Sequence, residues 1–146
     1  MAISNLVIES ANSADLDDIL RLLSASSLPT SGVAEILSQF LVIKDGETIL
    51  AAGAVERHGD DGLLRSIVVD ASARGMGLGR KITEALVLSS ERDLYLLTET
   101  AAAFFVKYGF EHLSREEAPA ELRQSEEFRC LCPESASFMR RSVDSV

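Results

Sequence analysis

With 146 residues, of which 47% are hydrophobic, the chain is long enough for one domain with a substantial core and too apolar to be disordered. Its formal net charge of −9 argues against a nucleic-acid partner. No apolar run approaches the ~18 residues of a membrane span, so we expect no membrane segment.

The first half of the chain predicts an antiparallel meander with two helices. Met1 to Leu6 carries neither a basic region nor a long apolar stretch, so we expect no signal peptide and a cytoplasmic protein. Ser13 is the predicted N-cap of the first helix, because aspartates and apolar residues at helical spacing follow it. The segments expected here are a strand at 6–9, a helix from 13, a short helix over 33–40, a strand at 41–43, a turn at 44–47, a strand at 49–56 with a bulge at Gly53, a turn at 58–62 and a strand at 63–70.

The second half predicts a helix followed by a buried strand. Leu78, Ile82, Ala85 and Leu86 recur at the spacing of one helical face. The long crossover predicts that the next strand runs parallel to the strand at 63–70. The remaining expected segments are that strand at 94–98, a short helix ending at Gly109, a strand at 110–113, a helical turn at 116–124 and a strand at 136–141.

A glycine-rich turn, Arg74-Gly75-Met76-Gly77-Leu78-Gly79, opens the helix after the strand at 63–70. Glycine lets the backbone approach an anionic ligand, and the first N–H groups of a helix point at such a ligand. The spacing fits neither the dinucleotide fingerprint nor the nucleotide P-loop. What remains is Arg-x-x-Gly-x-Gly, which predicts a pyrophosphate site.

A second motif, Tyr108-Gly109-Phe110, ends the short helix, and glycine there predicts a left-handed C-cap. The order strand, glycine turn, helix, strand and short helix resembles the GNAT family of N-acetyltransferases. The resemblance implies an α/β GNAT fold in one domain, 1–146, with a mixed, mostly antiparallel sheet whose central parallel strands splay apart between flanking helices. It also implies acetyl-CoA as co-substrate, a small-molecule amine as partner and no metal.

The same resemblance implies where the co-substrate binds. Its pantetheine would bond the backbone of residues 67–69, its pyrophosphate would lie on residues 74–79, and a backbone N–H at Val69 would stabilise the oxyanion. Lys81 is a weaker phosphate candidate than its neighbour Arg80. The predicted cofactor-binding residues are Ile67, Val68, Val69, Arg74, Gly75, Met76, Gly77, Leu78, Gly79, Arg80, Thr98 and Phe105.

Two of these positions depart from the family pattern. Phe105 stands where many relatives carry a tyrosine that protonates the leaving thiolate, and Thr98 stands where asparagine is common. Thr98 can still donate a hydrogen bond. Tyr108 lies three residues beyond Phe105 and is not expected to replace the acid. A thiol with a pKa of ~8.5 leaves acceptably without one.

Five residues are candidates for the chemistry of the amine. Glu56 ends a strand next to the central one, where the family often places a glutamate base, and Glu99, His58 and water remain alternatives. Arg65 and Ser66 are the predicted substrate-binding residues, and as strand neighbours they should face opposite sides. A buried Arg65 needs an anionic partner, which is either a substrate carboxylate or a protein acid such as Glu56.

Several segments are similar to small acetyltransferases associated with arsenic resistance. This resemblance implies an α-amino acid substrate with an acidic side chain, such as glutamate or its arsenic-bearing mimic arsinothricin. Cys130 and Cys132 lack a third thiolate, so we expect ordinary packing and not a metal site. The segments that carry the similarity are 64–66, 94–98, 104–105, 127–136 and 139–141.

Two other functions stay open. One is a protein or peptide N-acetyltransferase, which needs an extended groove. The other is a catalytically silent acyl-CoA-binding regulator, with which Phe105 is compatible. The identity of the amine and the oligomeric state, including a homodimer, are open as well.

Overall fold

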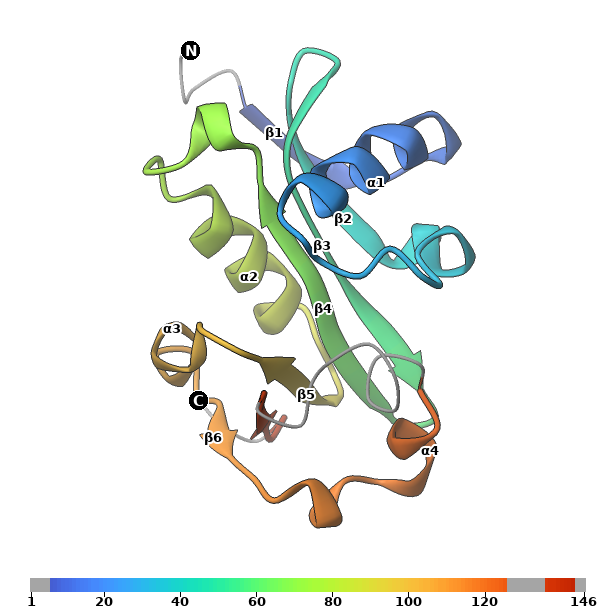
Figure 1. The fold of residues 1–146 in the computed structure, drawn as a ribbon, viewed down its shortest axis with the longest axis vertical. Helices are drawn as coiled ribbons and strands as arrows, with labels where there is room; N and C mark the ends of the chain where they lie inside the picture. The colour runs from blue at the N-terminus through green and yellow to red at the C-terminus, as the bar shows by residue number, and fades with distance from the viewer. Residues whose placement is uncertain (1–5, 126–135, 144–146) are drawn as a thin grey trace. The chain divides into compact units, whose positions relative to one another are not determined.

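Residues 6–125 and 136–143 are described by the computed structural model of the protein (Figure 1). In this part of the chain, seven strands form one sheet in the order β1-β2-β3-β4-β5-β7-β6. The strands are β1 (Leu6–Ser10), β2 (Phe40–Asp45), β3 (Thr48–His58), β4 (Asp61–Val69), β5 (Asp93–Thr98), β6 (Glu111–His112) and β7 (Ser137–Arg141). The α-helices are α1 (Leu16–Ala25), α2 (Leu78–Leu88), α3 (Ala102–Val106) and α4 (Ala120–Arg123), and the 3-10 helices are η2 (Ser13–Asp15), η3 (Ala34–Gln39), η4 (Ala71–Ala73) and η5 (Arg115–Glu117).

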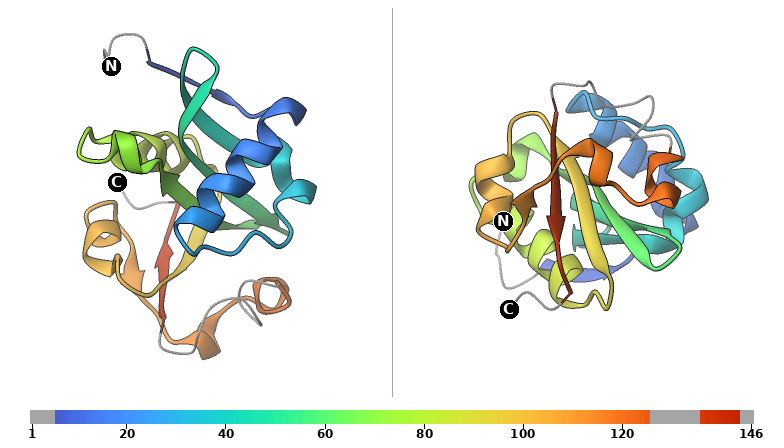
Figure 2. Two further views of the ribbon diagram at one scale, coloured as in Figure 1. Left: turned by 45° about the horizontal axis from the view of Figure 1, so that its top comes forward. Right: turned by 90° about the horizontal axis from the view of Figure 1, so that it is seen from below.

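The sheet is mixed, as predicted. β4 and β5 run parallel, and their ladder joins Asp61–Leu63 to Asp93–Tyr95. The pairs β1–β2, β2–β3, β5–β7 and β6–β7 are antiparallel, and Figure 2 shows β7 between β5 and β6. Because the parallel ladder ends at Leu63 and Tyr95, well before the end of β4, the splayed central pair is confirmed.

The chain forms two compact units, and β3 and β4 each contribute residues to both. The first unit takes in the described residues of Met1–Ala54 and Ser66–Leu86, and the second those of Val55–Arg65 and Val87–Val146. Each unit is described below by itself. The single domain expected over 1–146 stays a prediction.

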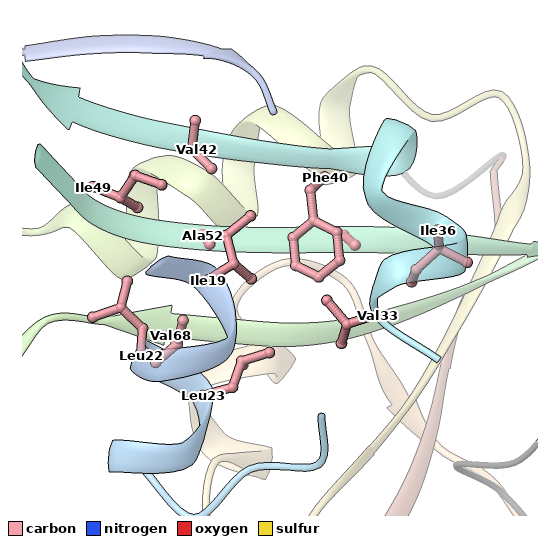
Figure 3. Packing of buried hydrophobic residues seen from close by; sticks show 11 residues of the cluster. Ile19, Leu22, Leu23, Val33, Ile36, Phe40, Val42, Ile49, Ala52 and Val68 are labelled. Atoms are coloured by element: carbon pink, nitrogen blue, oxygen red, sulfur yellow. The ribbon is translucent and has the colours of Figure 1, made fainter. Parts of the chain in front are cut away.

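In the first unit, apolar side chains of α1 pack against the strands (Figure 3). Side chains alternate along a strand, so Ala52 faces α1 and Gly53 faces the opposite side. There a Cβ at Gly53 would lie 2.5 Å from Cδ1 of Ile67 and 3.0 Å from Cδ1 of Leu86, so glycine permits the approach of α2. The buried cluster on the α1 side contains Ile19, Leu22, Leu23, Val33, Ile36, Phe40, Val42, Ile49, Ala52, Ala54 and Val68.

The second unit has a smaller apolar cluster. Its aromatic rings Tyr95 and Phe138 stack with their centroids 5.7 Å apart. Gly109 has φ +90°, which confirms the predicted left-handed end of the short helix, and Arg141 Nε donates to the Tyr108 carbonyl at 2.9 Å. The buried members of the cluster are Leu63, Tyr95, Ala118, Leu122 and Phe138.

Two predictions about the first helices are wrong. Asn12, not Ser13, caps the first helical segment: its side chain accepts from the Ala14 N–H, and the Asp15 carboxylate accepts from the Asn12 N–H, each at 2.9 Å. This capping box opens η2, which leads into α1. Phe40 begins β2 instead of ending a helix, because the preceding segment is the kinked 3-10 helix η3.

Two predictions about the strands are also wrong. The irregularity in the β2–β3 pairing lies between Ile43 and Lys44, and Gly53 keeps its regular partner. Gly53 therefore serves the packing of α2 and is not a bulge. The turn expected at 58–62 shrinks to Gly59-Asp60, because cross-strand pairing extends β3 and β4 almost to the hairpin tip.

Candidate functional site

The turn between β4 and α2 exposes its main chain to a ligand. Gly75 and Gly77 have φ of +85° and +77°, in the region that favours glycine. The Lys81 N–H donates to the Gly77 carbonyl at 3.0 Å and closes the first turn of α2. The N–H groups of Leu78 and Gly79 precede this bond, at the end of the helix where main-chain donors are available to a ligand. Apart from the adjacent residues of the chain, no atom of the described residues lies within 4 Å of a Cβ added at either glycine. Together with the helix dipole, this open backbone suits a pyrophosphate.

The last residues of β4 alternate between the two faces of the first unit. Val68 is buried in the α1 cluster, whereas Ile67 reaches the opposite side near Gly53. Val69 Cγ2 would lie 3.5 Å from a Cβ at Gly79, so the missing side chain brings α2 close to β4. Binding of pantetheine and of the oxyanion by the backbone of these three residues stays a prediction.

The cationic side chains of the turn already have protein partners. Arg74 Nη2 donates to Ser26 Oγ at 3.4 Å, a contact with the end of α1 that the sequence does not signal. Arg80 Nε lies 3.1 Å from Glu84 Oε1, and its side chain is 72% exposed. Leu78 is buried, so its main chain is the part that a ligand can meet. Met76, between the two glycines, is half-buried.

Asp70 shapes the entry to this turn. It caps η4 by accepting hydrogen bonds from the backbone N–H and the hydroxyl of Ser72. These two hydrogen bonds, together with the charges of Arg21 and Arg74, hold the pKa of the Asp70 carboxyl below its usual value. Asp70 therefore stays ionised and fixes the main chain just before the glycines.

In the second unit, the β3–β4 hairpin joins three of the candidate side chains. His58 Nε2 lies 2.8 Å from Glu56 Oε1, and Arg65 Nη1 lies 3.5 Å from Glu56 Oε2. The side chains of Arg65, Glu56 and His58 are 1%, 15% and 18% exposed. Residues two apart in a strand share a face, and the two-residue turn sets the pairing that brings Arg65 to them.

The charge state of Glu56 follows from these contacts. Burial alone would raise the pKa of its carboxyl, but the hydrogen bond with His58 and the charge of Arg65 outweigh burial and lower the pKa. Glu56 is therefore an ionised carboxylate at neutral pH. Of the two partners that the sequence suggested for Arg65, the structure contains the protein acid, Glu56.

Ser66 departs from the prediction that it and Arg65 simply face opposite sides. Its φ of +62° is in the left-handed region, which a residue in a regular strand does not adopt. The strand alternation that the prediction assumed is therefore interrupted at Ser66. Its assignment as a substrate-binding residue stays a prediction.

Thr98 and Phe105 serve the local structure of the second unit. The Thr98 hydroxyl accepts a hydrogen bond from the Ala101 N–H at 3.0 Å and so caps the turn before α3. Phe105 is buried and packs edge-on against Phe104 and Phe110, at centroid distances of 5.1 and 5.8 Å. Their roles toward the co-substrate stay predictions. Glu99, one of the alternative bases, is exposed just beyond β5.

Within residues 6–125 and 136–143, no group of three or more His, Cys, Asp or Glu side chains could hold a metal ion. Cys130 and Cys132, with most of the segment 127–136, lie outside the described residues. Among the helices described, none has the length and apolar character to cross a membrane.

Comparison with known proteins gives one family match and many structural matches. The model of the acetyltransferase (GNAT) domain matches residues 37–112, which is slightly more than half of the chain. A search of curated proteins finds no match.

Three solved structures illustrate the structural matches. N-acetylglutamate synthase from Neisseria gonorrhoeae, complexed with coenzyme A and N-acetyl-glutamate, gives a TM-score of 0.79 at 17% identity over 94% of this chain and 35% of the synthase. Rv2747 from Mycobacterium tuberculosis, in complex with CoA and NLQ, gives 0.78 at 20% identity over 93% and 98%. A GNAT-family acetyltransferase from Staphylococcus aureus gives 0.74 at 14% identity over 94% and 99%. The chain thus spans about a third of the synthase, and the likeness at these identities is one of fold.

Proposed function

Because the chain belongs to the GNAT acetyltransferase family, we propose that it transfers the acetyl group of acetyl-CoA to the amine of a small, glutamate-like amino acid. The observation that carries the proposal is the turn at 74–79, where two glycines of positive φ and the start of α2 leave an open backbone. A pyrophosphate fits there because main-chain N–H groups and a helix dipole meet it without a side chain in the way. Two of the similar structures contain CoA.

Bound acetyl-CoA supplies an activated thioester, and the residues of the chain hold and polarise it. We assign the pantetheine to the backbone of Ile67–Val69 and the pyrophosphate to residues 74–79, with Arg74 and Arg80 as neighbouring cations. The Thr98 hydroxyl, which accepts from Ala101, can still donate its proton. The Val69 N–H is the proposed donor to the charge that develops on the thioester oxygen.

The amine must lose a proton before it can attack. The proposal gives this step to the hydrogen-bonded pair of Glu56 and His58. Ser66 is the proposed residue for substrate recognition, because Arg65, the other residue predicted for this role, pairs with Glu56. Attack of an amine on a thioester needs no metal, so none is included, and we place the reaction in the cytoplasm.

A glutamate-like substrate is supported by two similarities. The gonococcal synthase, whose complex contains N-acetyl-glutamate, shares the fold. The segments 64–66, 94–98, 104–105, 127–136 and 139–141 resemble acetyltransferases associated with arsenic resistance. Arsinothricin, a glutamate mimic, therefore belongs to the proposed substrate class.

A panel of amines tests this function. We would measure CoA release from acetyl-CoA with the common amino acids, with phosphinyl and arsinyl analogues of glutamate, and with a lysine-containing peptide. The expected result is fastest release with L-glutamate or its analogues. Fastest release with the peptide would replace the proposal by a peptide acetyltransferase. Acetyl-CoA binding without release for any amine would replace it by an acyl-CoA-binding regulator.

A further inference from the structure

Both carboxylate oxygens of Glu56 already have a partner within the β3–β4 hairpin. Oε1 lies 2.8 Å from Nε2 of His58, and Oε2 lies 3.5 Å from Nη1 of Arg65. Arg65 is buried with 1% of its side chain exposed, so it is a fixed cation at one end of the chain of contacts. Glu56 stands in the middle, and His58 is the more exposed end.

These contacts decide which nitrogen of His58 carries a proton. The ionised carboxylate of Glu56 can only accept, so Nε2 of His58 must be the donor. In a neutral imidazole the other nitrogen, Nδ1, is then an acceptor with a free lone pair. The bond from Nε2 is the one hydrogen bond of this ring to a partner within residues 6–125 and 136–143.

Glu56 is a poorer candidate than His58 for removing the proton. A carboxylate that two cationic or hydrogen-bonding neighbours stabilise holds its lone pairs in those contacts. The lone pair of Nδ1 has no such engagement among the described residues.

We infer that His58 accepts the proton of the substrate ammonium through Nδ1, and that Glu56 and Arg65 are positioning residues. The inference rests on the proposed acetyl transfer. The ammonium N–H bond breaks and an Nδ1–H bond forms, which leaves an electron pair on the substrate nitrogen. That pair forms the bond to the acetyl carbon, and the C–S bond breaks with its electrons on sulfur. The second amine proton goes to the thiolate, and His58 returns its proton to water.

The chain offers a matched control, because His112 is its only other histidine. His58→Ala and His58→Gln should lower kcat by ~100-fold or more with the amino acid that releases CoA fastest in the panel. His112→Ala should leave kcat unchanged, and all three variants should keep the acetyl-CoA affinity. Added imidazole should restore part of the rate of His58→Ala.

The tautomer provides a readout that does not depend on activity. Nitrogen-15 NMR of the two histidines should show His58 protonated on Nε2 in the wild-type protein and a smaller fraction of that tautomer in Glu56→Gln. An Nδ1–H tautomer in the wild type overturns the inference, and so does full kcat in both His58 variants. The proposed function survives both results. Only a wild-type protein that releases CoA with no amine overturns the function and the inference together.

Discussion

The turn at 74–79 would act on a ligand through its main chain, whereas the group formed by Glu56, His58 and Arg65 would act through side chains. In the turn, the atoms that would bind a ligand are backbone N–H groups. The two glycines matter because they have no side chain to block access to these groups. In the hairpin, the useful atoms are a carboxylate, an imidazole and a guanidinium, each held by the next. The turn should therefore fail when atoms are added to it, and the hairpin group when one of its side chains is removed.

Adding atoms to the turn should have the largest effect. Gly77→Glu should weaken acetyl-CoA binding by at least ~100-fold, about 2.8 kcal/mol, because a carboxylate enters the place proposed for the pyrophosphate. Gly46→Glu is the matched control, since Gly46 also has positive φ (+62°) and, among the described residues beyond its chain neighbours, no atom within 4 Å of an added Cβ. Calorimetric titration of both folded variants measures the difference. Equal affinities would remove the turn from the proposed site.

Removing the central carboxylate of the hairpin group should cost stability. Glu56→Gln leaves the buried Arg65 without this charge partner, so we expect a loss of roughly 1–3 kcal/mol in denaturant unfolding at pH 7. Glu47→Gln, at an exposed turn, should stay within about 0.5 kcal/mol. Because the folded-state pKa of Glu56 is lowered, its stabilisation is present above the ordinary value of ~4.3 and is lost as the pH falls through the folded-state pKa. A difference that grows in acid would contradict the ion-pair account.

Replacing the Arg65 guanidinium by an ammonium distinguishes its two possible roles, which are holding Glu56 and binding a substrate carboxylate. If Arg65 holds Glu56, Arg65→Lys should lower the Tm by about 4 °C for a loss of ~1 kcal/mol and should slow acidic and neutral amino acids alike. A point charge replaces a planar fork in this variant, so geometry changes while charge remains. A rise in KM confined to acidic amino acids, at unchanged Tm, would assign Arg65 to the substrate carboxylate instead.

Tyr108 tests whether a side chain outside the hairpin supplies the acid that Phe105 lacks. The Tyr108 ring packs against Phe104 at a centroid distance of 5.3 Å, and its carbonyl accepts from Arg141. Tyr108→Phe keeps both contacts, so kcat should fall by less than the ~100-fold expected for loss of general acid catalysis. A larger fall at preserved acetyl-CoA affinity would make Tyr108 the acid.

The smallest expected effect concerns Asp61 in the second unit, whose ionised carboxylate is destabilised by burial and by neighbouring negative charges. Burial and the neighbouring charges of Asp93 and Asp60 raise the pKa of Asp61. A raised pKa means that the wild-type protein gains stability as acid protonates Asp61 and loses it as the pH rises through that value. Asp61→Asn should therefore stabilise the protein at pH 7 by roughly 0.5 kcal/mol and flatten this dependence. Asp93→Asn should destabilise it, because Asp93 pairs with Arg140.

The two regions also differ in how far the sequence predicts them. Glycine at 75, 77 and 109 is required by the local conformation, so spacing alone located the turn and the end of the short helix. The sequence offered Glu56 as one of two possible partners of Arg65 but did not choose between them, because the predicted turn had five residues and the hairpin turn has two. The presence of a glycine also does not reveal which structural role requires it. Gly53 leaves room for α2, whereas the sequence suggested a bulge.

The alternation of side chains along a strand contained a prediction about the hairpin that the sequence analysis did not draw. Glu56 and His58 are two apart in β3 and so share a face, and this spacing alone predicts that the two side chains lie together. No sequence pattern predicts that Ser26 is the partner of Arg74, because 48 residues separate them. The left-handed conformation of Ser66 is likewise not predictable from the sequence, since serine does not favour positive φ.

Mass analysis of a single reaction tests the proposed acetyl transfer most directly. The wild-type protein would be incubated with acetyl-CoA carrying a carbon-13 acetyl group and with L-glutamate, and the free CoA and the labelled amino acid would be counted together. The expected result is one N-acetyl-glutamate for each CoA released, and none with Gly77→Glu. Acetyl-CoA that stays intact on the protein, with no labelled product from L-glutamate or any other amine of the panel, would contradict it.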